Sequence, residues 1–305
     1  MDIAAVLRDD YNLEPVTEVV DMSARSGCYR VTIGDRRYVL KQVGRPDFAS
    51  VYDKVQRALN EQELVQARVI PTRDGQVMRP DGYWLLEYIA GEAPVTYDDA
   101  QFVQVLSYLR RYNQALRAVP FVPAELSRVN IWDLVKSTDF LRQSAATIAE
   151  RSDVAGWQRS LLNTATGVLA DNSALLERAP KQLIHADVGP GNVIFAAGRV
   201  RAIIDFTPDF EHELYSLAHF LYWTCLFGAQ QPPQGRFEAA LDTYSGRPPS
   251  AGDQQLMFVY LVKACLLRIM GPALSLIETN TFSVARIERR LAALASLLES
   301  FHVRF

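Results

Sequence analysis

The chain has 305 residues, of which 49% are hydrophobic and 22% charged, and its formal net charge at pH 7 is -3. This composition is typical of a globular protein and excludes disordered and fibrous classes, and the length suits two lobes or one large α/β unit. A net negative charge gives no general attraction to phosphate backbones, so we expect no nucleic-acid partner.

The cysteines and the apolar runs predict the cellular setting. Cys28, Cys225 and Cys265 lie far apart and form no C-x-x-C pair, which favours a reducing, cytoplasmic environment. The first residues lack the basic and apolar regions of a secretory signal. The run 217–229, taken here as the most apolar helix-like stretch, is shorter than the roughly 20 residues needed to cross a bilayer. We therefore expect a cytoplasmic protein without a membrane partner.

The first ninety residues are predicted to form strands and turns with one helix among them. Alternating apolar residues on both sides of Gly34-Asp35 predict a hairpin over 28–43 that ends near Lys41. Residues 46–60 place apolar side chains at helical spacing. Residues 67–78 and 82–91 predict further strands around a turn at Asp74-Gly75.

After Gly91 the sequence changes to long amphipathic segments separated by Pro and Gly clusters. These predicted helices cover roughly 98–118, 131–149, 154–178, 212–228, 252–270 and 283–300. Only 183–206 interrupts them with β-type sequence. The predicted fold class is α+β, with a small strand-rich N-terminal lobe at 1–91 and a larger helical C-terminal lobe at 92–305.

One loop rich in Gly and Pro carries a specific pattern of polar residues. His185-x-Asp187 is followed by Asn192, and Asp205 ends the apolar strand that comes next. This order and spacing are typical of phosphoryl transfer, in which one Asp accepts the proton of the attacking hydroxyl while an Asn and a second Asp hold Mg²⁺. The alternative is that His185 and Asp187 cap a turn and Asp205 only ends a strand. The combined spacing favours the catalytic interpretation.

The quoted stretch "HADVGPGNVIF" followed by "IIDF" resembles the catalytic loop and metal-binding segment of the aminoglycoside phosphotransferase group, which includes choline and homoserine kinases. The resemblance implies a bilobal protein-kinase-like fold that uses ATP and Mg²⁺. It implies that Asp187 is the catalytic base, that Asn192 and Asp205 are Mg²⁺ ligands, and that His185 supports the loop.

The same resemblance implies nucleotide contacts in the N-terminal half. Lys41 would contact the α- and β-phosphates, with an exposed strand-end lysine as the alternative. The loop before it would cover the phosphates, with Ser26 and Gly27 as its backbone contacts. The backbone carbonyl of Glu87 and the amide of Ile89 would meet the adenine edge, although a plain edge strand explains the same apolar pattern.

Three positions depart from the pattern of related enzymes. The predicted helix at 46–60 presents no inward glutamate, so the acidic partner of Lys41 stays unassigned. Ser216 stands where the family usually has an aspartate that braces the catalytic loop, and serine can exchange hydrogen bonds but supplies no charge. Thr207 replaces the glycine that protein kinases have after the metal-binding aspartate.

Two groups of residues are candidates for recognition of the acceptor. Asp209, Glu211 and Glu213 with His212 could attract an ammonium group, or they could form a solvated helix start whose acidic residues favour the helix dipole. Aromatic residues could line a wall for a cation or a sugar, or could pack in the core. These are Trp132, Trp157, Tyr222 and Trp223.

The sequence therefore predicts an ATP- and Mg²⁺-dependent phosphotransferase that acts on a hydroxyl of a small polar molecule that could be cationic, such as an aminoglycoside, an amino sugar or an amino alcohol like homoserine. The alternative is a nucleotide-binding pseudokinase scaffold, suggested by Ser216 and the missing helix glutamate. Phosphorylation of a protein is weakened because the segment after Asp205 is too short for an activation segment.

Overall fold

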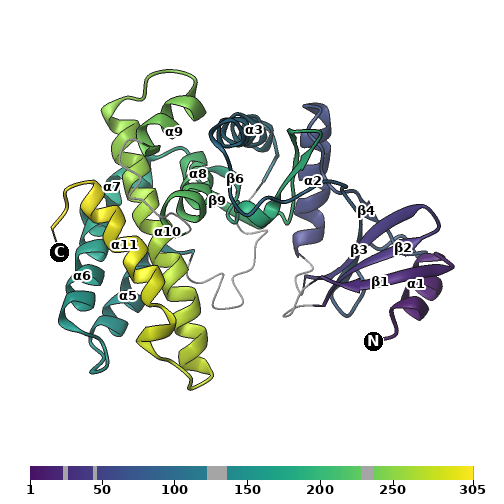
Figure 1. Ribbon diagram of the computed structural model, residues 1–305, viewed down its shortest axis with the longest axis horizontal. Helices are drawn as coiled ribbons and strands as arrows, with labels where there is room; N and C mark the ends of the chain where they lie inside the picture. Colours follow the sequence, from purple (N-terminus) through teal and green to yellow (C-terminus); the bar gives the residue numbers. More distant parts are fainter. Residues whose placement is uncertain (23–26, 44–46, 122–135, 228–235, 305) are drawn as a thin grey trace.

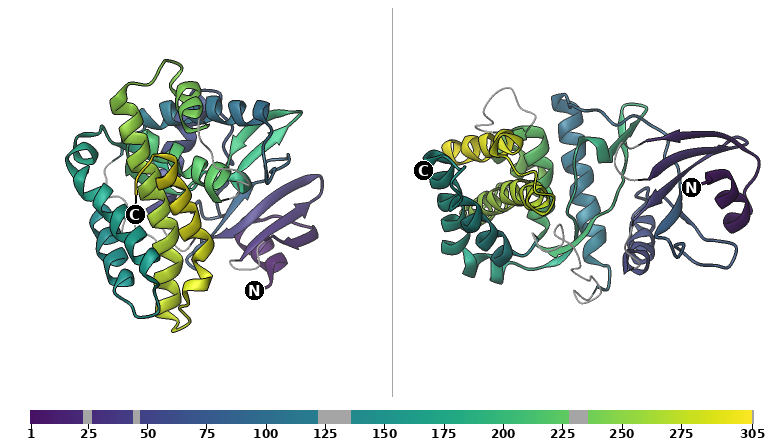
Figure 2. Two further views of the ribbon diagram at one scale, coloured as in Figure 1. Left: turned by 60° about the vertical axis from the view of Figure 1, so that its left-hand side comes forward. Right: turned by 90° about the horizontal axis from the view of Figure 1, so that it is seen from below.

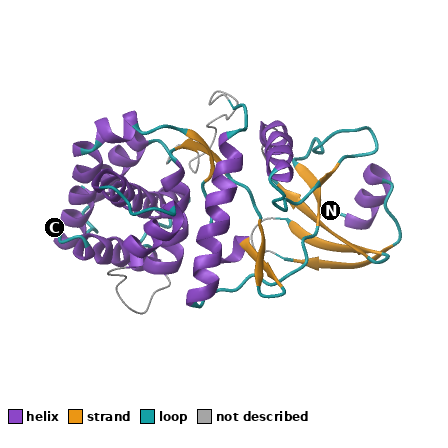
Figure 3. Cartoon of the chain, turned by 90° about the horizontal axis from the view of Figure 1, so that it is seen from above, coloured by secondary structure: helices purple, strands orange, loops and turns teal. Residues whose placement is uncertain are grey.

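The computed structural model describes residues 1–22, 27–43, 47–121, 136–227 and 236–304. A small sheet and its helices lie at one end of the molecule, and a group of long helices lies at the other (Figures 1 and 3). This arrangement confirms the predicted α+β class, with a small strand-rich lobe and a larger helical lobe.

The small lobe is built on one antiparallel sheet. Its strands follow the order β1-β2-β3-β5-β4, with bounds β1 Val16–Asp21, β2 Cys28–Ile33, β3 Arg36–Gln42, β4 Val69–Ile70 and β5 Tyr83–Glu87. The predicted hairpin is confirmed, because Val31 pairs with Tyr38 and Gly34 adopts the positive φ of 56° that a tight turn needs. The turn at Gly75 is also present, but only Val69–Ile70 of the stretch 67–78 forms a strand.

Helix α1, Ile3–Tyr11, was not predicted. Asp2 caps its first turn by accepting a hydrogen bond from the backbone of Ala5, 3.1 Å away. Leu7 and Tyr11 are buried in a hydrophobic cluster whose other buried members come from the sheet. The helix is thus held by packing against the strands.

Helix α2, Asp47–Glu61, confirms the predicted helix, and its apolar face belongs to the main core of the protein. Val51, Val55 and Leu59 are fully buried in the same cluster as the residues of α3, Asp99–Arg117. Helix α3 lies between the small lobe and the remaining helices (Figure 2). The main core therefore reaches from α2 into the helical lobe, and the domain division at residue 91 stays a prediction.

The remaining helices have bounds α5 Thr138–Ala149, α6 Gly156–Asp171, α7 Ser173–Arg178, α8 Glu213–Leu221, α9 Arg236–Ser245, α10 Ala251–Glu278 and α11 Glu288–Ser300. The predicted helix over 154–178 is broken at Asn172, which ends α6. Helix α8 continues as a π-helix, Tyr222–Phe227. Helix α9 was not predicted.

Helix α10 corrects the prediction that 217–229 is the most apolar helix-like run. Among the described residues it is the one helix long and apolar enough to pass a test for a bilayer span, but most of it is buried inside the protein. The core helix of a globular protein passes the same test.

The β-type stretch that was predicted at 183–206 lies in two small antiparallel strand pairs. Strand β6, Gln182–His185, pairs with β9, Pro208–Glu211, while β7, Val193–Ala196, pairs with β8, Arg199–Ile203. The loop with Asp187 therefore joins β6 to β7, and Asp205 lies between β8 and β9. The β7–β8 pair lies between β6 and β9 in the chain, so the pairing of β6 with β9 brings the loop with Asp187 and the segment with Asp205 into one region.

The connection between the lobes is fixed to β7 through backbone contacts. The N–H of Glu92 donates to the carbonyl of Phe195 at 2.9 Å, and the N–H of Phe195 donates back to Glu92 at 2.8 Å. Gly91 has a φ of 154°, and a Cβ at this position would collide with the Phe195 carbonyl. Only glycine allows this close approach, which places the end of β5 beside the catalytic segment.

Candidate active site

A cavity of about 360 Å³ lies between the sheet and the β7–β8 pair, a size typical of small-molecule sites. Five residues predicted from the sequence line it, namely Lys41, Glu87, Ile89, Asn192 and Asp205. They come from β3, from the end of β5 and from the two sides of the β7–β8 pair. The fold thus gathers residues that lie up to 164 positions apart.

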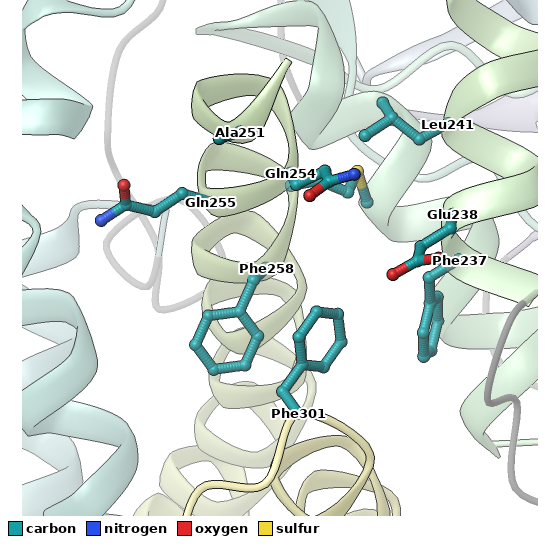
Figure 4. Close-up of a pocket in the computed structure, with 9 residues that line it drawn as sticks. Phe237, Glu238, Leu241, Ala251, Gln254, Gln255, Phe258 and Phe301 are labelled. Carbon is teal, nitrogen blue, oxygen red and sulfur yellow. The ribbon is translucent and has the colours of Figure 1, made fainter. Parts of the chain in front are cut away.

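A second cavity, of about 320 Å³, lies between α9, α10 and the end of α11. Figure 4 shows the rings of Phe258 and Phe301 beside each other there, with centroids 4.5 Å apart. None of the residues predicted for the active site lines this cavity.

His185 organises the catalytic loop from the buried end of β6. Its Nε2 lies 3.0 Å from the carbonyl of Ile204 and its Nδ1 lies 3.1 Å from the N–H of Asp187. The carbonyl accepts and the N–H donates, so the proton of the ring is on Nε2. Burial lowers the pKa of His185, which keeps the ring neutral and the loop contact to Asp187 intact.

Asn192 and Asp205 both line the cavity. The Nδ2 of Asn192 donates to the backbone carbonyl of Asp187 at 2.8 Å, and this hydrogen bond ties the Asn192 amide group to the catalytic loop. Asp205 has a positive φ of 58° and forms an ion pair with Lys41. Its side chain is 45% exposed, so the carboxylate stays accessible from the cavity.

The donor set of these two residues fits Mg²⁺. The ion prefers hard oxygen ligands and is usually held by one or two protein carboxylates together with phosphate oxygens and water. In the part of the chain that the structure describes, no three His, Cys, Asp or Glu residues gather as a metal site. An amide oxygen from Asn192 and a carboxylate from Asp205 would hold the ion jointly with a bound phosphate.

The acidic partner of Lys41, left unassigned from the sequence, is Asp205. Helix α2 presents Tyr52 to the cavity, where its hydroxyl donates to the carbonyl of Ala67 at 2.7 Å. The ring of Tyr52 packs edge-on against Trp84, with centroids 4.8 Å apart. A tyrosine that is fixed to the backbone of the segment before β4 thus lies where α2 faces the cavity.

Asp187 forms an ion pair that the sequence did not predict. The Nη2 of Arg268, on α10, donates to its Oδ1 at 2.6 Å. Burial raises the pKa of Asp187, but the positive charge and hydrogen bond of Arg268 outweigh this effect and the pKa is lowered. Asp187 is therefore a carboxylate at neutral pH, the form that can accept a proton.

Ser216 still braces the catalytic loop, but without a charge. Its side chain is fully buried on α8 and its Oγ donates to the carbonyl of His185 at 2.9 Å. The loop is thus supported from both sides, by the ring of His185 and by the hydroxyl of Ser216.

Of the remaining predicted nucleotide contacts, Ser26 lies outside the described residues. Gly27 has a φ of 45°, and a Cβ there would collide with the hydroxyl of Tyr83. The side chain of Glu87 turns to Arg68, 2.6 Å away. The backbone N–H of Ile89 donates to no group in the described chain, which leaves it able to bind a ligand in the cavity.

For Glu211 both interpretations are wrong, because it is neither free for an ammonium group nor solvated, whereas Glu213 is partly exposed in the first turn of α8, as the helix-start interpretation predicted. Glu211 is buried and accepts from Lys263 at 2.6 Å and from Tyr260 at 3.0 Å. Glu213 accepts from Arg117 at 2.9 Å. His212 caps α8 through its Nδ1.

The four aromatic residues do not share one role. Tyr222 is fully buried, Trp157 is 47% exposed on α6, and Trp132 lies outside the described residues. The ring of Trp223 packs against Gly189 of the catalytic loop, where a Cβ would come within 2.9 Å of its Cδ1. Among these four aromatic residues, Trp223 is thus the one that the structure places against the catalytic loop.

A model of the family described as "Phosphotransferase enzyme family" matches residues 23–247. Similar solved structures include a choline kinase from Streptococcus pneumoniae, 15% identical over 97% of this chain and 98% of that one, with a TM-score of 0.65. The microcompartment-associated aminopropanol kinase is 18% identical over 99% and 98%, with a TM-score of 0.69.

A thermostable mutant of an aminoglycoside phosphotransferase, in a ternary complex with ADP and hygromycin B, is 17% identical over 98% of this chain and 99% of that one, with a TM-score of 0.66. At these identities the likeness concerns the fold. No curated protein sequence matches the chain at a significant level.

Proposed function

The chain belongs to the phosphotransferase enzyme family. We propose that it is a small-molecule kinase that transfers the γ-phosphate of ATP to a hydroxyl of a small polar molecule with the help of Mg²⁺. The observation that carries the proposal is the convergence of Lys41, Asn192 and Asp205 on one cavity. Asn192 is also bonded to the backbone of Asp187, which joins the cavity to the proposed base.

ATP would occupy the cavity with its adenine edge against the end of β5. The N–H of Ile89, which has no partner among the described residues, supports this placement, with the backbone carbonyl of Glu87 as the second contact. Lys41 would exchange Asp205 for the α- and β-phosphates, which its accessible ion pair allows. Gly27 and Ser26 would cover the phosphates with backbone N–H groups.

Asp187 would accept the proton of the acceptor hydroxyl while that oxygen bonds to the γ-phosphorus and the bond to the β–γ bridging oxygen breaks. Asn192 and Asp205 would hold Mg²⁺, which neutralises the charge on the phosphates. The lowered pKa of Asp187 supports this role because the group is ionised before the acceptor binds. His185 and Ser216 keep the loop in place during the transfer.

The acceptor would be an amino alcohol such as homoserine, an amino sugar or an aminoglycoside-type molecule, and the enzyme would work in the cytoplasm. Choline kinase, aminopropanol kinase and the hygromycin complex among the structural neighbours support this range. The acidic pairs of Glu211 and Glu213 offer no free charge to a cationic acceptor, so recognition of an ammonium group would fall to other residues.

The second candidate is a pseudokinase scaffold that binds nucleotide but transfers little or no phosphate. Two observations favour it: the described side chains of α2 supply no acidic partner to Lys41, and the brace at Ser216 carries no charge. Against it stands the retention of a base and two metal ligands in one region, which a scaffold does not need. Slow Mg²⁺-dependent ATP hydrolysis without acceptor would favour the enzyme, whereas tight ATP binding without hydrolysis would favour the scaffold.

The proposal is tested by substrate-dependent ADP release from a panel of amino alcohols, amino sugars and aminoglycosides. We expect at least one acceptor to be turned over, and Asp187→Asn to lower kcat by about 10²- to 10⁴-fold because the proton acceptor is lost. The nucleotide affinity of this variant should stay close to that of the wild type, whereas its unfolding temperature should fall, because the buried charge of Arg268 loses its carboxylate partner. An Asp187→Asn variant with the full rate would show that the base is another residue.

A further inference from the structure

We propose that Arg268 is a positioning residue for the transfer: it fixes the carboxylate of Asp187 in the orientation that receives the acceptor's proton. This inference rests on the proposed function. It assigns a role to α10, which lies far along the chain from the catalytic loop and contributes no residue to the predicted site.

The position of Arg268 is costly unless it has a partner. Within the stretch 256–270 of α10, the charged residues are Lys263 and Arg268, and the stretch is otherwise mostly buried and apolar. Lys263 is paired with Glu211, and Arg268 is paired with Asp187. Because a charge without a partner in such a place is strongly destabilising, each cation is held there by its carboxylate.

The guanidinium is held by more than one contact. Its Nη2 lies 2.6 Å from Oδ1 of Asp187 and 3.2 Å from Nδ1 of His219. Burial and the charge of Arg268 lower the pKa of His219 well below its usual range, so the ring is neutral and its Nδ1 accepts the hydrogen bond. His219 is fully buried on α8, which gives Arg268 a fixed anchor.

Trp223 closes the arrangement against the loop itself. The guanidinium carbon of Arg268 lies 4.9 Å from the centre of its ring, a cation–π distance. The same ring also contacts Gly189, two residues after Asp187, where there is no room for a Cβ. The arginine, the indole and the loop backbone therefore form one packed unit around the base.

This unit would restrict the rotation of the Asp187 side chain. An arginine bound to Oδ1 would limit the orientations in which the carboxylate can meet the acceptor hydroxyl. Small misplacements of a reacting group cost large factors in rate, so a fixed carboxylate contributes to kcat without touching the substrate.

The test compares Arg268→Met, which removes the charge and keeps much of the apolar volume, with Arg268→Lys, which keeps the charge but not the planar fork. We expect Arg268→Met to lower kcat about 10- to 100-fold, with the KM values for ATP and acceptor within about threefold of wild type. Arg268→Lys should recover part of the lost rate.

Arg289→Met is the matched control. Arg289 also lies over an aromatic ring of the π-helix, 4.4 Å from the centre of Phe227, but its Nη2 donates to a backbone carbonyl and not to Asp187. We expect its kcat to equal that of the wild type. A similar loss in both variants would attribute the effect to general packing of the π-helix and would overturn the proposal.

A second measurement separates positioning from a purely structural role. If Arg268 acts through Asp187, Arg268→Met should change the residual rate less than threefold when it is added to Asp187→Asn, because the group that it positions is already lost. Additive losses in the double variant would contradict the proposal. So would a raised acceptor KM with unchanged kcat, which would indicate that Arg268 binds the acceptor directly.

Failure of this proposal can be told from failure of the proposed function. If Asp187→Asn keeps the wild-type rate, the assignment of the base is wrong. If Asp187→Asn loses the rate while a folded Arg268→Met keeps it, only the role of Arg268 is wrong. If Arg268→Met does not fold, Arg268→Lys and Trp223→Phe replace it in the same test. We expect both variants to have a lower kcat than the wild type. The wild-type kcat in both variants would contradict the proposal. Acceptor-independent ATP hydrolysis serves as the readout when no acceptor is turned over.

Discussion

The two carboxylates of the active site are held in different ways. Asp205 pairs with Lys41, and the two side chains are 45% and 23% exposed. Asp187 pairs with Arg268, which is only 12% exposed and is enclosed by His219 and Trp223. An accessible partner can be exchanged for a phosphate and a metal ion, whereas an enclosed partner is part of the frame. Burial of the cation thus separates a replaceable contact from a fixed one.

A third pair extends the comparison to full burial. Lys263 and Glu211 join α10 to β9 with side chains that are 2% and 8% exposed. Lys263 also lies 4.7 Å from the centre of the Tyr215 ring. The three pairs therefore form a series of rising enclosure, and substitution of each cation in turn tests what burial does.

The largest effect on folding is expected from Lys263→Met. It leaves Glu211 buried without its main partner, and loss of one member of a buried pair costs about 3–5 kcal/mol. Urea denaturation should show this loss as a lower midpoint with an unchanged slope. The double variant Lys263→Met/Glu211→Leu, which removes both charges, should be much closer to wild type; an equally unstable double variant would show that the charges are not the cause.

The same pair makes a smaller, pH-dependent contribution. Burial raises the pKa of Glu211, but the charge and hydrogen bond of Lys263 outweigh it, so the pKa is lowered in the folded state. The stabilisation is therefore present above the usual glutamate pKa of about 4.3 and is lost as the pH falls below it. Unfolding free energies measured from pH 7 to pH 3 should fall more steeply for wild type than for Lys263→Met/Glu211→Leu. Parallel curves would contradict the assignment.

Lys41→Met should affect ligand binding and leave folding almost unchanged. Loss of a partly exposed pair costs the free protein at most about 1 kcal/mol. Loss of a charged contact to phosphate should weaken binding of Mg²⁺·ADP by about 1.5–3 kcal/mol, or roughly 10- to 150-fold, in calorimetric titration. Arg68→Met is the matched control, because Arg68 pairs with Glu87 at the same cavity but its cation does not line it. Equal losses in both variants would contradict the phosphate role of Lys41.

The same contrast explains which parts of the site could be predicted from the sequence. Asp187, Asn192 and Asp205 lie within nineteen residues of one another on consecutive turns and strands, so their spacing alone predicts that they meet. The contact of Arg268 with Asp187 spans 81 residues and depends on how α10 packs against α8. The sequence shows only an arginine within an apolar helix, and this pattern does not indicate which residue Arg268 contacts.

The fold shows the same limit. The hairpin over 28–43 is a local pattern of alternating residues around Gly34 and was predicted, whereas α1 was missed. Helix α1 has nine residues and buries only Leu7 and Tyr11, so its periodicity is weak and its stability comes from the sheet. Likewise, the pairing of Lys41 with Asp205 joins residues 164 positions apart, so it follows from tertiary packing and not from a local pattern.

The smallest effect on stability is expected for a fourth, exposed ion pair. Arg57 and Asp53 lie one turn apart on α2, 2.5 Å from each other, with side chains that are 71% and 58% exposed. Arg57→Gln should lower the free energy of unfolding by no more than about 0.3–0.5 kcal/mol, and 1 M salt should abolish the difference because water and ions screen the pair. The loss in Lys263→Met should persist in the same salt, since the buried pair is not reached by ions. If salt removed both differences equally, burial would not be what separates the fixed pairs from the replaceable ones.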